Sequence, residues 1–133
     1  MNLFGRQIAA AASLVSDVAK FNGAPSNLAI QAKFAYGSGG TSVDAYVQTS
    51  LDGGATWIDI AEFNFTTSAA TKIFNLSALT AKTTAAVPTD GSLAANTAVD
   101  GILGSQFRLK VVSVGTYAGA TRLDVDIATD QAA

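Results

Sequence analysis

The sequence predicts an all-β protein, an antiparallel β-sandwich of seven to eight strands with jelly-roll or Greek-key connections. Short runs with apolar residues at every second position recur along the chain, and glycine-containing turns separate them. No internal segment carries a convincing helical period. Short strands at regular spacing with such turns are typical of sandwiches and partly closed barrels. At 133 residues the chain has the size of one domain, large enough to bury a core.

The N-terminal segment is the ambiguous part of the chain. The four alanines at 9–12 favour a helix by propensity, whereas every second residue from Ile8 to Leu14 is apolar. Small side chains on both faces suit an extended segment that lies against another surface. We therefore predict an N-terminal arm or edge strand at 1–21, followed by the sandwich domain at 22–133.

The first clear strand is expected at 27–36, after a turn cluster at 22–26 that contains glycine and proline. One face of this strand is apolar and carries Leu28, Ile30, Ala32, Phe34 and Tyr36. The alternation indicates a half-buried strand. Gly37-Ser38-Gly39-Gly40 then interrupts the pattern, and its length predicts a hairpin loop.

The hairpin at 41–65 is the most clearly marked element. Two alternating runs flank an Asp52-Gly53-Gly54 corner, where glycine supplies the positive φ angles that suit a tight β-turn. One face of the first run carries Val43, Ala45, Val47 and Thr49. One face of the second run carries Trp57, Asp59, Ala61, Phe63 and Phe65, and the other carries Ile58, Ile60, Glu62 and Asn64.

Three further strands are expected in the second half of the chain, at 71–79, 107–114 and 123–127. The stretch at 80–100 is the longest irregular segment and contains Pro88. Loops of this length are often binding surfaces, so we expect an interface here.

The last two strands are expected to pair as a hairpin across a glycine-flanked corner at 115–119. Arg108 and Lys110 would then face Asp124 and Asp126 on the solvated side of that hairpin. Opposite charges across strands contribute only about 0.2–1 kcal/mol each, so they would set register more than stability.

Charged residues are scarce, at 14% of the chain against about 25% in typical soluble domains. We therefore predict that part of the surface packs against another chain, including copies of the same chain. The net charge of −2 and the absence of a Lys/Arg cluster argue against nucleic-acid binding. Only Arg6 precedes the short apolar run at 8–15, so we expect no cleaved export signal, and no run approaches the ~18 apolar residues of a membrane span.

Residues 50–57 match the pattern S-x-D-x-G-x-T-W. This stretch resembles the Asp-box of sialidases and other β-propeller proteins, although only one copy is present. The resemblance implies a structural turn, in which Asp52 caps backbone amides, Gly54 adopts a positive φ and Trp57 packs beneath the corner. The alternative is a carbohydrate-binding module in which Trp57 stacks on a sugar, together with Tyr46 and Tyr117.

Catalytic and metal-binding groups are few. The chain has no histidine and no cysteine, which excludes serine triads that need histidine and all thiol chemistry. Candidate calcium ligands are Asp90, Asp100, Asp124 and Asp126, and a candidate glycosidase set is Asp44, Asp59 and Glu62. No EF-hand pattern is present, and nothing in the sequence marks the second set as perturbed. We predict no enzyme activity, no cofactor and no metal.

Residues 25–128 as a whole resemble small structural proteins of tailed bacteriophages, through phrases such as GSGGTSVDAYVQTSLDGGATW and GSQFRLKVVSVGTY. Such proteins are often β-sandwiches. The resemblance implies a capsid decoration (cement) protein on the virion exterior, assembled in the bacterial cytoplasm, whose partners are the major capsid protein and copies of itself. Residues 1–21 would lie along a neighbouring chain. The alternative position in the virion is a neck or tail connector.

Overall fold

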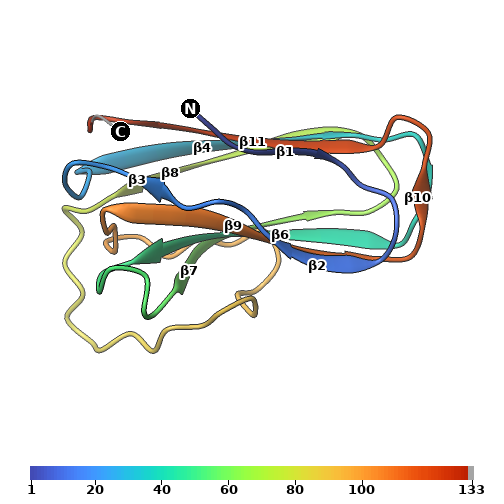
Figure 1. Ribbon diagram of the computed structural model, residues 1–133. Helices are drawn as coiled ribbons and strands as arrows, with labels where there is room; N and C mark the ends of the chain where they lie inside the picture. The colour runs from blue at the N-terminus through green and yellow to red at the C-terminus, as the bar shows by residue number, and fades with distance from the viewer. Residues whose placement is uncertain (132–133) are drawn as a thin grey trace.

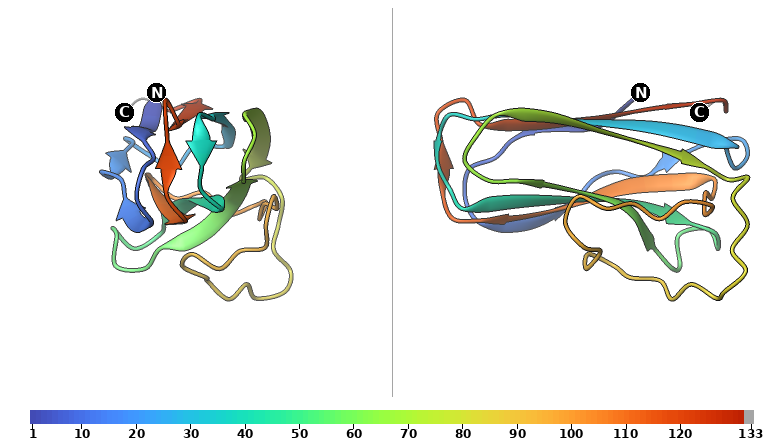
Figure 2. Two further views of the ribbon diagram at one scale, coloured as in Figure 1. Left: turned by 90° about the vertical axis from the view of Figure 1, so that its right-hand side faces the viewer. Right: turned by 180° about the vertical axis from the view of Figure 1, so that it is seen from behind.

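The computed structural model describes residues 1–131, which form two antiparallel β-sheets packed face to face. Figure 1 and the end-on view in Figure 2 show the two layers, with a long loop beneath the lower one. The predicted all-β antiparallel sandwich is confirmed. No helix long and apolar enough to span a membrane occurs among these residues.

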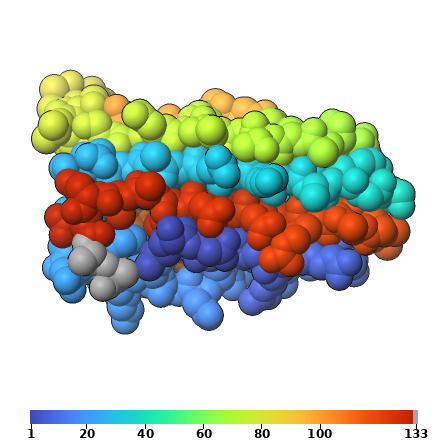
Figure 3. All heavy atoms as spheres, turned by 90° about the horizontal axis from the view of Figure 1, so that it is seen from above, coloured from blue at the N-terminus to red at the C-terminus, as the bar shows by residue number. Residues whose placement is uncertain are grey.

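The first sheet, called sheet A, has four strands. Their order is β1 (Asn2–Gln7), β11 (Arg122–Thr129), β4 (Asn27–Ala35) and β8 (Ala70–Ser77). Figure 3 shows these strands side by side on the outer face of the molecule. Alternate residues of β4 are buried and exposed along its whole length, as the period-two pattern predicts.

The second sheet, called sheet B, contains the predicted hairpin. Its order is β2 (Ala12–Val15), β9 (Gln106–Val114), β6 (Ser42–Ser50) and β7 (Ile58–Phe65), and β3 (Ala19–Lys20) also pairs with β9. A third, two-stranded pairing joins β5 (Ser38–Gly39) to β10 (Tyr117–Ala118) at one end of the sandwich.

The strand order is that of a jelly roll. The pairs β1–β11, β2–β9, β4–β8 and β6–β7 are nested, so the chain is one long antiparallel hairpin that has been folded over into two sheets. Successive strands therefore change sheet at most connections, and the exceptions among the described residues are β2–β3 and β6–β7, which both lie in sheet B. This topology is the eight-strand double-sheet jelly roll.

Two predicted hairpins are wrong for this reason. The glycine segment at 37–40 carries the chain from β4 in sheet A to β6 in sheet B, and β9 and β11 likewise lie in different sheets. Gly40 shows why glycine is needed at the crossing. Its φ is +72°, and a Cβ there would lie 2.3 Å from the ring of Tyr117.

Residues 1–21 pair with strands of their own chain and cross from sheet A to sheet B along one edge. β1 pairs with β11, whereas β2 and β3 both pair with β9. The N-terminal amine of Met1 donates to the carbonyl of Ile127 at 3.0 Å. β1 and β2 are thus edge strands of the two sheets and are held by their own chain.

The core lies between the two inner faces and is rich in aromatic rings. Phe34 stacks on Phe65 with ring centroids 5.0 Å apart, and Tyr117 packs edge-on against Phe34. The Tyr117 hydroxyl donates to the carbonyl of Thr66 at 2.7 Å, so the one polar atom of this ring has a partner in the interior.

Candidate functional site

The connection between β8 and β9 crosses the outer face of sheet B, as both views in Figure 2 show. Its first part, residues 79–88, is here called the exposed loop, and its second part, residues 89–99, the clasped segment. The candidate site consists of this connection and the polar side chains beneath it.

A β-bulge in the hairpin decides which side chains meet the clasped segment. Val47 pairs with Ala61 and Gln48 pairs with Asp59, so Ile60 has no partner on β6. The extra residue reverses the alternation and turns Asp59 to the outer face beside Gln48. The sequence pattern placed Asp59 on the face of Phe63 and Phe65, and this prediction is wrong because of the bulge.

Asp59 accepts hydrogen bonds from five donors, four of which lie in the clasped segment. Its carboxylate accepts from Gln48 Nε2 at 2.8 Å and from Thr89 Oγ1 at 2.8 Å. It also accepts the backbone amides of Gly91, Ser92 and Leu93 at 2.8–3.2 Å. The side chain is 1% exposed. A buried carboxylate with this many donors is a structural anchor, because few lone pairs are left for a substrate or metal.

Asp90 extends the anchor to β9. Its Oδ1 accepts from Gln48 Nε2 at 2.7 Å and lies 3.3 Å from Lys110 Nζ and 3.6 Å from Arg108 NH2. The Gln48 hydrogen bond, followed by the two cations, lowers the pKa of Asp90 below its usual value. Asp59, Asp90, Gln48, Arg108 and Lys110 are together called the clasp.

The corner at 50–57 is built as an Asp-centred turn. Thr56 donates its amide to Asp52 Oδ1 at 2.7 Å, and Gly54 donates its amide to Ser50 Oγ at 2.8 Å. The Thr56 amide is the largest cause of a lowered pKa at Asp52, followed by hydrogen bonds with the Thr56 and Ser50 side chains. Gly54 has a φ of +97°. The contacts of Asp52 and Gly54 are those that turn chemistry requires.

The three aromatic residues proposed for sugar binding do not gather. Trp57 is half-buried, and the Arg108 guanidinium lies 4.4 Å above its ring centroid. Tyr46 is 8% exposed beneath the connection, and Tyr117 is 2% exposed within the core. None of them therefore offers a free, flat ring face beside another.

The exposed loop lies beyond the clasp, and residues 79–88 are solvent-exposed throughout. Leu79 and Val87 are 84% and 85% exposed, the highest values among the large apolar residues that the structure describes. Asp100 anchors the start of this loop, since it accepts from the Ser77 amide at 2.6 Å and from Thr80 Oγ1 at 2.9 Å. The exposed loop is thus anchored at both ends while its own side chains lie in solvent.

An apolar hollow of about 520 Å³ separates the exposed loop from the end of the sandwich. Lys82 contributes its only charged side chain. Its other walls come mainly from alanine, proline, leucine and isoleucine residues, among them Leu51, Ala81, Pro88 and Ile102. The hollow and the exposed loop together form a surface whose only charged side chain is Lys82.

The proposed carboxylate set does not form a catalytic pair open to substrate. Glu62 is 1% exposed. Burial, followed by the neighbouring Asp44 carboxyl, raises the pKa of Glu62 to about 7. Asp59 is used by the clasp. The perturbed Glu62 carboxyl is therefore closed off from solvent rather than presented in a cleft.

The four acidic residues considered for calcium lie apart. Asp90 belongs to the clasp and Asp100 to the base of the exposed loop, whereas Asp124 and Asp126 lie on β11. No group of three or more acidic side chains converges within residues 1–131. Asp124 contacts Arg122 at 3.0 Å, so the predicted pairing of Arg108 and Lys110 with the β11 aspartates is wrong.

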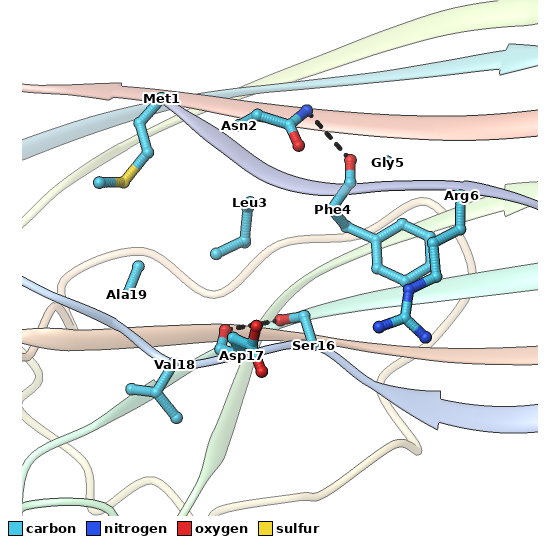
Figure 4. A pocket seen from close by; sticks show the side chains of 10 residues that line it. All are labelled: Met1, Asn2, Leu3, Phe4, Gly5, Arg6, Ser16, Asp17, Val18 and Ala19. Carbon is cyan, nitrogen blue, oxygen red and sulfur yellow. Dashed lines mark hydrogen bonds between the residues drawn. The ribbon is translucent and has the colours of Figure 1, made fainter.

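A further shallow cavity, of about 320 Å³, lies where the N-terminal segment crosses between the sheets (Figure 4). β1 forms one wall and residues 16–19 the other. Two of the polar side chains at its rim bond to nearby backbone, since Asn2 Nδ2 donates to the Phe4 carbonyl and Ser16 Oγ to the Asp17 carbonyl. These two side chains therefore stabilise the crossing of the N-terminal segment.

No family model, curated protein or solved structure is detectably similar to this chain. The candidate site is therefore defined by the geometry of its own residues. Sequence reasoning expected an interface at 80–100 but missed the clasp. No signal in the sequence marked it, because Gln48 shares its strand face with the polar Asp44 and Ser50, and such a face predicts exposure to solvent.

Proposed function

We propose that this protein is a virion structural protein, a capsid decoration protein that bridges major capsid subunits of a tailed bacteriophage. The observation that carries the proposal is the exposed loop, whose apolar side chains Leu79 and Val87 lie almost fully in solvent while both of its ends are anchored. A protein that works alone gains nothing from fixing apolar groups in water. A docking protein gains affinity, because less conformational entropy is lost on binding.

Two further observations support an assembly role. Only 14% of the residues are charged, and core interface surfaces are poor in charged residues. The jelly-roll topology recurs in viral capsid domains, although it also occurs in lectins, so the fold alone does not decide the function. The buried aromatic residues favour assembly over sugar binding, since stacking on a sugar needs an accessible ring.

The mechanism would be mechanical. The sandwich would form a rigid body, and the exposed loop would insert its apolar side chains into a groove of a neighbouring subunit. Each contact would be modest, and many copies would stabilise the shell together. The protein would lie on the capsid exterior after assembly in the bacterial cytoplasm, without a catalytic step or a cofactor.

The test is the copy number of this chain in purified native particles, measured by quantitative mass spectrometry against the major shell protein. A ratio near one, or a simple fraction of one, is expected for a decoration protein. A ratio of a few per cent would instead place the chain in the neck or tail. Absence from particles would overturn the virion proposal and direct attention to glycan binding.

A second test addresses the exposed loop itself. The double substitution Leu79→Ser and Val87→Ser should abolish binding to shells that lack the protein, with the fold unchanged. Ile73→Ser is the matched control, because Ile73 is also exposed, at 64%, but lies on the outer face of sheet A. Equal loss of binding in the control would contradict docking through the loop.

A further inference from the structure

The clasped segment ends as an additional strand on the free edge of β7. The Glu62 amide donates to the carbonyl of Thr97 at 2.9 Å, and the Val99 amide donates to the carbonyl of Ile60 at 2.8 Å. A β-bridge joins Ala61 to Ala98. This pairing covers the edge of sheet B and buries the Glu62 side chain beneath it.

Two carboxyl groups meet under this added strand. Asp44 on β6 and Glu62 on β7 are diagonal neighbours on the outer face, since Asp44 pairs with Asn64 and Tyr46 pairs with Glu62. After burial, Asp44 is the next largest cause of the raised pKa of Glu62. Asn64 Nδ2 donates to Asp44 Oδ1 at 2.8 Å.

Asn96 pins the segment above this pair. It has a φ of +57° and is the only non-glycine residue with a positive φ in the described part of the chain. Its amide donates to Glu62 Oε1 at 3.4 Å, and its Oδ1 accepts the Asn64 amide at 3.0 Å and Lys72 Nζ at 3.1 Å. A left-handed residue persists only where its surroundings hold it.

The other charged groups around Glu62 do not neutralise it. Lys72 on β8 contacts the Asn64 carbonyl and Asn96 rather than the Glu62 carboxyl. On β9, Arg108 and Lys110 turn to Asp90 in the clasped segment. The remaining titratable groups on this face are Tyr46 on β6 and Asp59 on β7, and both add negative charge or none. An ionised Glu62 would be buried beside Asp44 without a cation in contact.

We propose that residues 94–98 form a proton-dependent latch, which is closed on β7 while Glu62 is protonated and opens when Glu62 ionises. Opening lets water reach the Glu62 carboxylate. The clasp keeps residues 89–93 in place, because its donors to Asp59 are backbone amides, the Thr89 hydroxyl and an amide side chain. Opening of the latch thus frees residues 94–98 from β7, while residues 89–93 stay bound to Asp59. It does not depend on the proposed role in the virion.

Amide hydrogen exchange followed by NMR at pH 5.5 and pH 8.5 tests the latch. Protection factors, corrected for the intrinsic pH dependence of exchange, are compared for Glu62, Asn64 and Val99. We expect a fall of about tenfold or more at the higher pH. The amides of Gly91 and Leu93, which bond to Asp59, are the internal reference and should keep their protection. Equal protection of the latch amides at both pH values would overturn the proposal.

Two variants assign the effect to the carboxyl pair. Glu62→Gln stays neutral and should hold the latch amides protected at both pH values, whereas an unchanged fall in this variant would refute the assignment. Asp44→Asn removes the neighbouring charge and should move the midpoint of the fall to lower pH. If Glu62→Gln does not fold, two other measurements test the assignment: the midpoint of the fall in Asp44→Asn, and an NMR titration of the Glu62 carboxyl carbon in the native chain. A Glu62 titration midpoint at the ordinary value of about 4.5 would contradict the proposal.

Discussion

The two outer faces of the sandwich place the same kinds of polar residue in opposite environments. On sheet A, Gln31 and Lys33 are exposed and the face is open to solvent (Figure 3). On sheet B, Gln48, Asp59 and Glu62 are at most 1% exposed, because the connection between β8 and β9 covers them. Along the strands of both sheets, outward-facing residues alternate with apolar residues that face the core. The strand patterns of the two sheets are therefore similar, and only the covering of the outer face by the connection differs.

Charged groups affect the stability of this molecule mainly on the closed outer face of sheet B. A charged group on the open face interacts with water and contributes little to stability. A charged group under the connection must have protein partners, and losing one leaves buried donors unsatisfied. The closed face therefore couples the conformation of the connection to the ionisation and identity of a few side chains.

The largest expected effect is the removal of Asp59. Asp59→Ala leaves the amides of Gly91, Ser92 and Leu93 without their acceptor, and we expect the free energy of unfolding to fall by about 4 kcal/mol. Urea unfolding measures this change.

The matched control is Asp126→Ala on the open face. Asp126 accepts one hydrogen bond, from Asn2 Nδ2 at 3.1 Å, so its removal should change the free energy of unfolding by no more than about 0.5 kcal/mol. Similar losses at the two positions would contradict the contrast between the faces.

The second effect is the pH dependence of Glu62. Its pKa rises from 4.5 to about 7 on folding, through burial and then through Asp44. The folded state therefore binds the proton more tightly, so the stabilising contribution is complete below pH 4.5 and is lost as the pH rises to about 7. The loss should total about 3 kcal/mol.

Unfolding free energies of the native chain and of Glu62→Gln, measured between pH 4.5 and 8, check this prediction. The native chain should lose stability across that window relative to the variant. If the unfolding free energies of the two proteins changed in parallel with pH, Glu62 would have the same pKa in the folded and unfolded states, and the prediction would be wrong.

A smaller effect is expected for Arg108. Arg108→Ala removes the hydrogen bond from Nε to Gln48 Oε1 at 2.7 Å and the cation–π contact with Trp57. We expect a loss of about 1–2 kcal/mol in the free energy of unfolding and a change in Trp57 fluorescence. Lys33→Ala, on the open face, is the control and should leave both quantities nearly unchanged.

The smallest effect on stability is expected in the exposed loop. Leu79→Ser and Val87→Ser remove apolar groups that are already in solvent, so the free energy of unfolding should change by less than about 0.5 kcal/mol. Differential scanning calorimetry checks this. A loss comparable to that of Asp59→Ala would mean that the loop packs onto the sandwich in solution.

Several elements could be read from the sequence because they depend on neighbours along the chain. The strand at β4 and the Asp52-Gly53-Gly54 corner lie where the pattern predicted them. Period-two alternation reports which face of a strand is buried. It does not report which strand lies alongside, and so the pairing of β9 with β11 was predicted and is absent.

The fold class, the burial of alternate residues and the position of the long connection at 80–100 could be predicted from the amino-acid pattern alone. Tertiary structure decided the jelly-roll order, the bulge at Ile60 and the burial of Asp59 and Glu62 under the clasped segment. The physical reason is that a one-residue bulge reverses a strand's faces, and its stability depends on donors such as the Gly91 amide, which lies 32 residues further along the chain. Contacts at that separation leave no periodic trace in the sequence.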